Sequence, residues 1–143
     1  LFPYTTLFRS IEFRSVCCQP IQDAMTVAAF HAGLKNKLYE LTELFDNDRV
    51  LYGHGYNATE LRHLFIKKEL PSFVEKDEVY ELTDRILRLA AEGLESRGYG
   101  ETELLEPLFE RIRKRENPAS YMLKRIADGA TVEDMIKEFA KRC

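Results

Sequence analysis

Glu12 and Arg14 are the two residues whose types and spacing are best suited to chemistry. They stand two apart in IEFRSV, where apolar and polar residues alternate as in a half-buried β-strand. Both side chains therefore project from one face of the strand, opposite Ile11 and Phe13. A carboxylate beside a guanidinium suits a nucleotide site, with Glu12 holding Mg²⁺ and Arg14 binding a phosphate or carboxylate. An exposed cross-strand ion pair would explain the same pattern.

The histidines and the main basic run give weaker signals. His54 in GHG and His63 in RHL each lack a second His or Cys at ligand spacing, so no zinc site built by the protein is predicted. His31 falls on an apolar helical stripe and is interpreted as a core residue. RIRKR, residues 111–115, could contact nucleic acid or an acidic partner. Its place at a helix end among glutamates favours a solvated helix terminus.

Composition narrows the class of protein. The 143 residues include 24 acidic and 21 basic side chains, a net charge of −3, which argues against a general nucleic-acid binder. The longest apolar stretch is too short to span a bilayer, so no membrane association is predicted. Cys17, Cys18 and Cys143 form no C-x-x-C pair, and reduced thiols in a cytoplasmic protein are the simplest interpretation.

The first ten residues, LFPYTTLFRS, do not resemble the start of a folded domain. Back-translated as CTC TTT CCC TAC ACG ACG CTC TTC CGA TCT, they look like the read-through of a DNA-sequencing adaptor. A natural extended arm is the alternative. We therefore expect residues 1–10 to be non-native and residues 11–143 to be part of a longer protein.

The elements after the predicted strand are helices. Pro20 begins a single long helix over residues 21–45. The small residues Ala28, Ala29, Ala32 and Gly33 indicate that another element packs closely against its first half. The expected inward stripe of this helix consists of Ala24, Val27, Ala28, His31, Leu34, Leu38, Leu41 and Phe45.

Capping patterns divide the rest of the chain. Asn57 with Glu60 is a capping box before LRHLFIKKEL, Asp77 can cap a helix closed by Gly98, and helices over 101–117 and from Asn117 follow. Thr131 caps the last helix. One strand followed by about five helices is mostly α, and a lone strand needs partners elsewhere. The sequence thus predicts a fragment of an α+β protein.

Two blocks resemble one family. IEFRSVCCQP…TVAAFHAGL, residues 11–34, resembles the E-x-R strand, proline and A-F-x-x-G-L helix of plant-type and bacterial glutamate–cysteine ligases. LRLAAEGLESRGYGETELLEPLFERIRKRENPASYML, residues 87–123, resembles that family's C-terminal helices, including a G-L-x-x-R-G-Y run and a T-P-A-type turn. With NATELRHLFIKKELP between them, the similarity covers nearly all of residues 11–143.

The resemblance implies a fold similar to glutamine synthetase, with an antiparallel catalytic sheet and helices packed outside it. It implies ATP- and Mg²⁺-dependent phosphorylation of the γ-carboxylate of glutamate, followed by attack of the cysteine amine to give γ-glutamylcysteine. Glu12 would then ligate the metal, and Arg14 would contact the phosphate of ATP or of the acyl phosphate. A transferred phosphoryl group needs cations and a fixed guanidinium rather than a protein nucleophile.

Further expectations follow from the same resemblance. Asn57, Arg62, His63 and Lys67 fall where bacterial relatives have a basic helix start near the nucleotide. Cys17-Cys18 replace an acidic and a small residue of the pattern. The family's other metal-binding glutamates belong to upstream strands that are missing here, so this chain alone is expected to be inactive.

Two alternatives stay open. A sister carboxylate–amine ligase would share this scaffold and use another acid or amine. A stand-alone helical interaction module would instead use RIRKR or the GHG loop as its contact surface, and would leave the strand unpaired.

Overall fold

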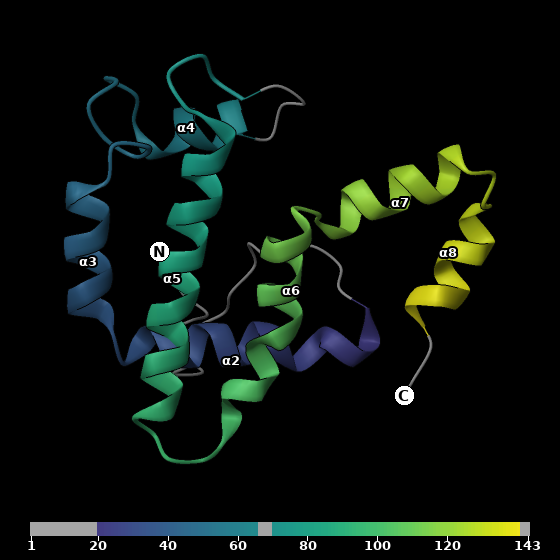
Figure 1. The fold of residues 1–143 in the computed structure, drawn as a ribbon, viewed down its shortest axis with the longest axis horizontal. Coiled ribbons are helices and arrows are strands. Elements are labelled where there is room, and N and C mark those ends of the chain that lie inside the picture. Colours follow the sequence, from purple (N-terminus) through teal and green to yellow (C-terminus); the bar gives the residue numbers. More distant parts are fainter. Residues whose placement is uncertain (1–19, 66–69, 141–143) are drawn as a thin grey trace, which may run out of the picture.

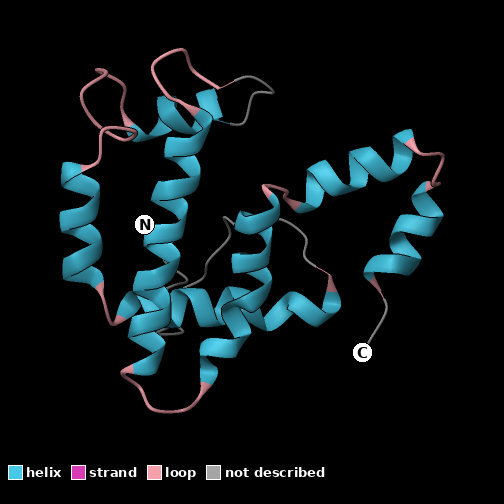
Figure 2. Ribbon diagram, viewed as in Figure 1, coloured by secondary structure: helices cyan, strands magenta, loops and turns pink. Residues whose placement is uncertain are grey.

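The structure of the chain is a computed structural model, and it describes residues 20–65 and 70–140. Within these ranges every regular element is a helix (Figure 2), which confirms the mostly helical character expected. The strand predicted at residues 11–16 lies outside the described residues. The elements are η1 (Ile21–Asp23), α2 (Ala24–Lys35), α3 (Leu38–Asn47), α4 (Ala58–Phe65), α5 (Lys76–Glu95), η2 (Glu101–Leu105), α6 (Glu106–Lys114), α7 (Pro118–Ala127) and α8 (Val132–Phe139).

The centre of the fold is the crossing of α2 and α5 (Figure 1). Gly33 and Gly93 meet there, and both are buried. A Cβ added to Gly33 would lie 2.8 Å from the carbonyl carbon of Ala90 and closer still to its oxygen, and one added to Gly93 would overlap the carbonyl of Gly33 in the same way. The expectation that the small residues of α2 mark a close approach is therefore confirmed.

The prediction of a single helix over residues 21–45 is wrong, because this segment is divided among η1, α2 and α3. α2 ends at Lys35, and two short turns follow, in which Asn36 and Lys37 donate their backbone N–H groups to Gly33 and Leu34 at 3.0 Å. The side-chain amide of Asn36 donates to the carbonyl of Gly93 at 3.1 Å. This bond fixes the end of α2 against α5, so that α3 leaves in a new direction.

The predicted inward stripe of α2 is also misplaced. Thr26, Ala29 and Gly33 are the buried residues of this helix, whereas Ala28 is exposed. Leu38, at the start of α3, is 59% exposed. The small side chains of α2 face α5, because only they permit the close approach of the two backbones. The largest apolar residues of α2 are therefore not its most buried ones.

Two apolar clusters hold the described helices together. The first joins α2, α5 and η2 through Ala29, Leu87, Ala90, Leu94 and Leu105, with residues of α6 packed against it. The second joins α3, the loop after it, the segment that precedes α5 and α5 itself, and consists of Leu44, Val50, Val74 and Leu82. Neither cluster includes a residue of α7 or α8.

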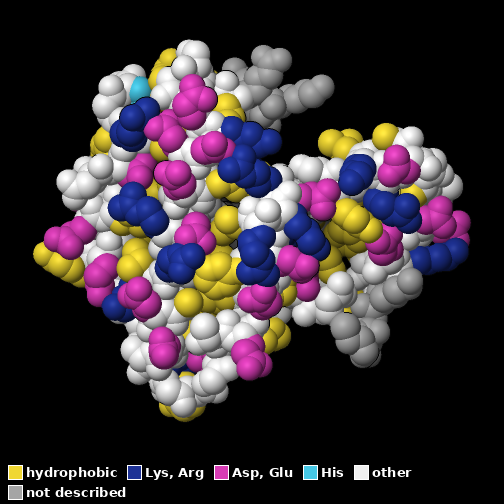
Figure 3. Space-filling model, viewed as in Figure 1, with side chains coloured by type: hydrophobic (Ala, Val, Ile, Leu, Met, Phe, Trp, Pro, Cys, Tyr) yellow, Lys and Arg dark blue, Asp and Glu magenta, His cyan; other side chains and the backbone are white. Residues whose placement is uncertain are grey.

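The last two helices form a separate pair at the side of the molecule (Figures 1 and 3). Neither α7 nor α8 packs extensively against any other described element. Met135 is 5% exposed, and the hydroxyl of Tyr121 donates to Glu138 across the pair. Within the part of the chain that the structure describes, no helix has both the length and the apolarity needed to cross a membrane.

Most of the helix caps predicted from the sequence are present in the structure. Asn117 and Thr131 accept from the backbone N–H groups of Ser120 and Asp134, at 2.8 and 3.1 Å, and so begin α7 and α8 as predicted. Asp77 is not the cap of α5. That helix begins after Glu75, whose N–H donates to Glu78 at 2.9 Å, and Asp77 lies in the first turn.

The cap of α8 predicts a pH dependence. The hydroxyl and the backbone N–H of Thr131 donate to Asp134 at 2.6 and 2.9 Å, and they lower the pKa of that carboxyl from its ordinary value. A depressed folded-state pKa stabilises the fold above about pH 4 and ceases to do so as the pH falls through the folded value. We expect the stability difference between the wild type and Asp134→Asn, measured by urea unfolding, to shrink between pH 7 and pH 3. A difference that is constant with pH would contradict this role.

Candidate functional site

The described part of the predicted nucleotide site is the start of α4. The side-chain oxygen of Asn57 accepts from the backbone N–H groups of Thr59 and Glu60, both at 3.0 Å. Glu60 accepts in return from the N–H of Asn57 at 2.8 Å, which completes the predicted capping box. The oxygen of Asn57 is therefore engaged in holding the helix, and the side-chain amide nitrogen is the group left to face a ligand.

The other predicted residues divide into two sets. Arg62 and His63 are exposed on α4, in its last turn, where a positive charge complements the helix dipole. Glu12, Arg14 and Lys67 lie outside the described residues. The structure therefore places Arg62 and His63 on one short helix and Asn57 at its cap, and the proposed metal and phosphate ligands remain predictions.

Removing the cap gives a direct test of its structural role. We expect Asn57→Ala to lower the free energy of unfolding by about 1 kcal/mol, because two backbone N–H groups lose their acceptor. Asn57→Ser should keep most of that stability, since serine is also a good cap. Urea unfolding of the two variants measures the difference. Equal stability of Asn57→Ala and the wild type would show that the cap contributes little.

The GHG loop turns its histidine inward. Gly53 and Gly55 have φ values of 87° and 80°, and between them the ring of His54 packs on Phe73 with a centroid distance of 4.6 Å. The backbone N–H of Tyr56 donates to Nδ1 of His54 at 3.2 Å. Nε2 is buried, with no hydrogen-bond partner among the described residues. The accepted bond at Nδ1 fits the neutral tautomer with its proton on Nε2, so this histidine closes the loop more than it presents a contact surface.

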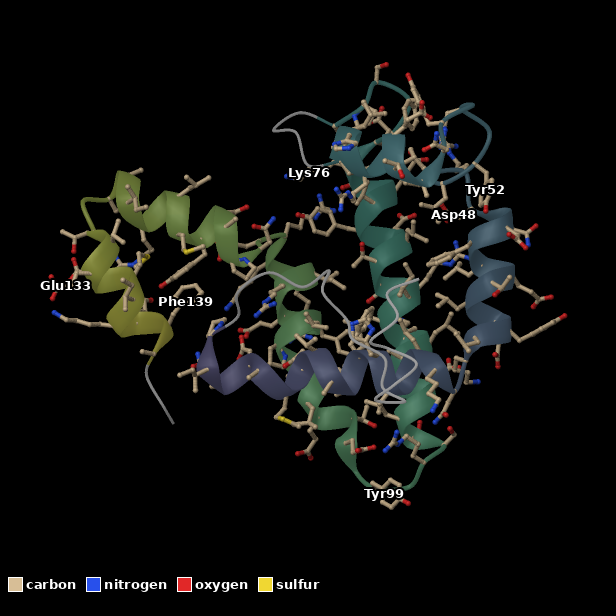
Figure 4. The ribbon with its side chains drawn as sticks, turned by 180° about the vertical axis from the view of Figure 1, so that it is seen from behind. Asp48, Tyr52, Lys76, Tyr99, Glu133 and Phe139 are labelled. Atoms are coloured by element: carbon tan, nitrogen blue, oxygen red, sulfur yellow. The ribbon has the colours of Figure 1, made fainter. Side chains whose placement is uncertain are left out.

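Asp48 is a buried carboxylate that was not among the residues predicted from the sequence. It begins the loop after α3 and is 8% exposed (Figure 4). One carboxylate oxygen accepts from the N–H of Val50 at 2.9 Å, and the other pairs with Arg85 of α5 at 3.3 Å. An aspartate two residues before a buried valine is typical of an Asx turn, and that local signal could have identified it.

The basic run RIRKR is neutralised by carboxylates. Arg111 pairs with Asp23 at 2.8 Å, and both side chains are partly buried. The other three cations are exposed, and they pair as Arg113 with Glu106, Lys114 with Glu110 and Arg115 with Asp77. The expectation of a solvated helix end holds for these three but not for Arg111, which joins α6 to η1.

Two cavities of about 580 Å³ each lie around α6. One is an apolar groove between α2, α5 and α6, lined by residues that include Phe30, Ile86 and Ile112, and part of this face is visible in Figure 3. The other is a polar cleft between α6 and the α7–α8 pair. Within residues 20–65 and 70–140, no group of three or more His, Cys, Asp and Glu side chains could hold a metal ion.

Comparison with known proteins found no matching family model, no matching curated protein and no matching solved structure.

Proposed function

We propose that the chain is the C-terminal, helical part of an ATP-dependent glutamate–cysteine ligase, and that its helices support the strand that carries Glu12 and Arg14. The observation behind the proposal is the packing of α2 on α5. The two glycines that meet there, Gly33 and Gly93, each belong to one of the two blocks that resemble the family. Residues far apart in the sequence thus form one structural unit, as two parts of a shared fold should.

The proposed chemistry is ligation through an acyl phosphate. The γ-carboxylate of glutamate takes the terminal phosphoryl group of ATP, and the amine of cysteine then displaces phosphate to form the γ-glutamyl amide. Glu12 would hold Mg²⁺, which neutralises charge on the transferred phosphoryl group, and Arg14 would bind its oxygens. Arg62, His63, Lys67 and the amide nitrogen of Asn57 would lie near the nucleotide. The enzyme would act in the cytoplasm.

The catalytic test uses the chain in two forms. We expect the 143-residue chain alone to form no γ-glutamylcysteine from glutamate, cysteine, ATP and Mg²⁺, because the remaining metal ligands would lie in upstream strands. In the complete parent protein, Glu12→Gln and Arg14→Lys should each lower kcat/KM by about 10²-fold or more, since each removes a group that stabilises transition-state charge.

Glu133→Gln is the matched control in that assay, because Glu133 lies on the side of α8 away from the body (Figure 4). This variant should keep full activity. An active isolated chain would contradict the claim that it is only part of the enzyme. Wild-type rates for the Glu12 and Arg14 variants of the parent protein would contradict the proposed roles of these two residues.

A helical interaction module remains the second candidate, and one observation favours it. Two apolar clusters join α2, α3, α5 and η2, so the described helices have buried apolar contacts of their own. A module should therefore be monomeric and should unfold cooperatively. A ligase fragment with an unpaired strand should dimerise or aggregate through that edge. Sedimentation velocity and urea unfolding of the chain separate the two candidates.

A further inference from the structure

The junction between α6 and α7 has an unusual backbone conformation. Arg115 ends α6 with φ 52° and ψ 38°, the left-handed region, and it is the non-glycine residue found there among the described residues. Its N–H donates to Ile112 and that of Glu116 to Arg111, both at 3.0 Å, which is the Schellman pattern. α7 ends in the same pattern with Gly129 at the equivalent place. An arginine in a glycine position is strained, so other contacts must hold it there.

The first turns of α5 supply those contacts. The hydroxyl of Tyr80 donates to the carbonyl oxygen of Arg115 at 2.9 Å, and the guanidinium of Arg115 lies 5.2 Å from the centroid of the same ring. Asp77 pairs with the guanidinium at 2.6 Å. Both the carbonyl and the side chain of Arg115 are thus held by α5, at the point where the chain leaves the body of the molecule.

The helix pair beyond this junction has no extensive contact with any other described element. α7 and α8 are joined to each other by the bonds of Glu138 with Tyr121 and Arg125, and they contribute to neither apolar cluster of the body. The polar cleft separates them from η1, η2 and α6. Phe139 lines that cleft from α8 and lies on the side of the helix nearer the body (Figure 4).

We propose that α7 and α8 form a hinged arm, and that Tyr80 and Asp77 act as a latch on Arg115 that sets the angle between the arm and the body. Residues 115–117 are the hinge. With the latch released, the arm rotates about these residues and narrows the cleft, because Phe139 can then pack on Pro20 and Pro107 of the opposite wall. The cleft is therefore adjustable, and its width depends on three side chains outside it.

Distance measurement across the cleft tests the latch. Spin labels are attached to Gln22→Cys and Lys137→Cys, with Cys17, Cys18 and Cys143 replaced by serine, and pulsed EPR gives the distance distribution. We expect one narrow distribution with the native latch. Adding Tyr80→Phe and Asp77→Asn should broaden it by about two-fold or more, toward shorter distances, because few contacts oppose the motion.

Matched variants make the outcome decisive. Tyr52→Phe removes the hydroxyl of an exposed tyrosine in the loop after α3 and should leave the distribution unchanged. Tyr80→Phe alone removes a single hydroxyl. It replaces the double variant in the experiment if circular dichroism shows that the double variant does not fold. An unchanged distribution in a folded latch variant would overturn the proposal, as would a wild type that is already as broad as the variant.

Discussion

Replacing Gly33 with alanine should lower the free energy of unfolding by about 3 kcal/mol, at the upper end of the costs of overpacking. The added methyl group would overlap the carbonyl of Ala90, which is backbone and cannot rotate away. Helix propensity acts in the opposite direction, since alanine is favoured over glycine by about 1 kcal/mol in a helix interior. We expect the clash to be larger, because α2 and α5 must separate along their whole contact to relieve it.

The matched control is Ala28→Gly, on the exposed side of α2. This substitution changes helix propensity without altering the contact with α5, and it should lower the free energy of unfolding by about 1 kcal/mol. Gly93→Ala should resemble Gly33→Ala, because its methyl group would overlap the carbonyl of Gly33. The double variant should cost less than the sum of the two, since one separation of the helices relieves both clashes. A stability for Gly33→Ala equal to or above that of the wild type, measured by urea unfolding, would contradict the close crossing.

Leu94→Ala should lower the free energy of unfolding by about 3 kcal/mol, because buried apolar surface is lost and a cavity is left behind. Leu94 is 0% exposed and packs with Leu87 and Leu105 in the cluster that joins α2, α5 and η2. The neighbouring Gly93 lies at the helix crossing, so the backbone there cannot collapse freely into the space.

Leu123→Ala is the control for this prediction, since Leu123 on α7 is 70% exposed. This substitution should lower the free energy of unfolding by no more than about 0.5 kcal/mol. Urea unfolding of both variants gives the comparison. Equal costs for the two leucines would mean that the α2–α5 cluster is not the core that stabilises the chain.

The features predicted correctly depend on residues close together in the sequence. Asn57 and Glu60, which form a capping box, are three positions apart, and the predicted cap Thr131 accepts from the N–H group three positions on. Such bonds form within one helical turn, so their sequence pattern is sufficient to locate them. The close approach of α2 was also predictable, because a run of small residues in a helix leaves room for a neighbouring backbone.

Apart from the misplaced cap of α5, the errors arose from contacts between distant residues. α2 ends where Asn36 bonds to Gly93, 57 positions away, and nothing near Asn36 indicates that bond. Asp23 and Arg111, 88 positions apart, likewise form an ion pair that no local pattern predicts. The buried face of α2 was misplaced because hydrophobicity was used to choose it, whereas the shape of α5 decides it.

Of the candidate site, only the helix that carries the predicted residues could be located from the sequence. The helix that carries Arg62 and His63 begins where its cap predicted, but a cap pattern does not say what approaches the exposed side of a helix. Glu12 and Arg14 owe their proposed roles to the resemblance, and they lie outside the described residues.

The measurement that tests the central claim most directly is the sequence of the source DNA across the codons for Ser10 and Ile11. We predict that the reading frame continues upstream of Ile11 into strands that carry further glutamates, and that the codons for LFPYTTLFRS are absent from the natural gene. A natural gene that encodes those ten residues, or that begins at Ile11, would contradict the assignment to a ligase and would favour the helical module.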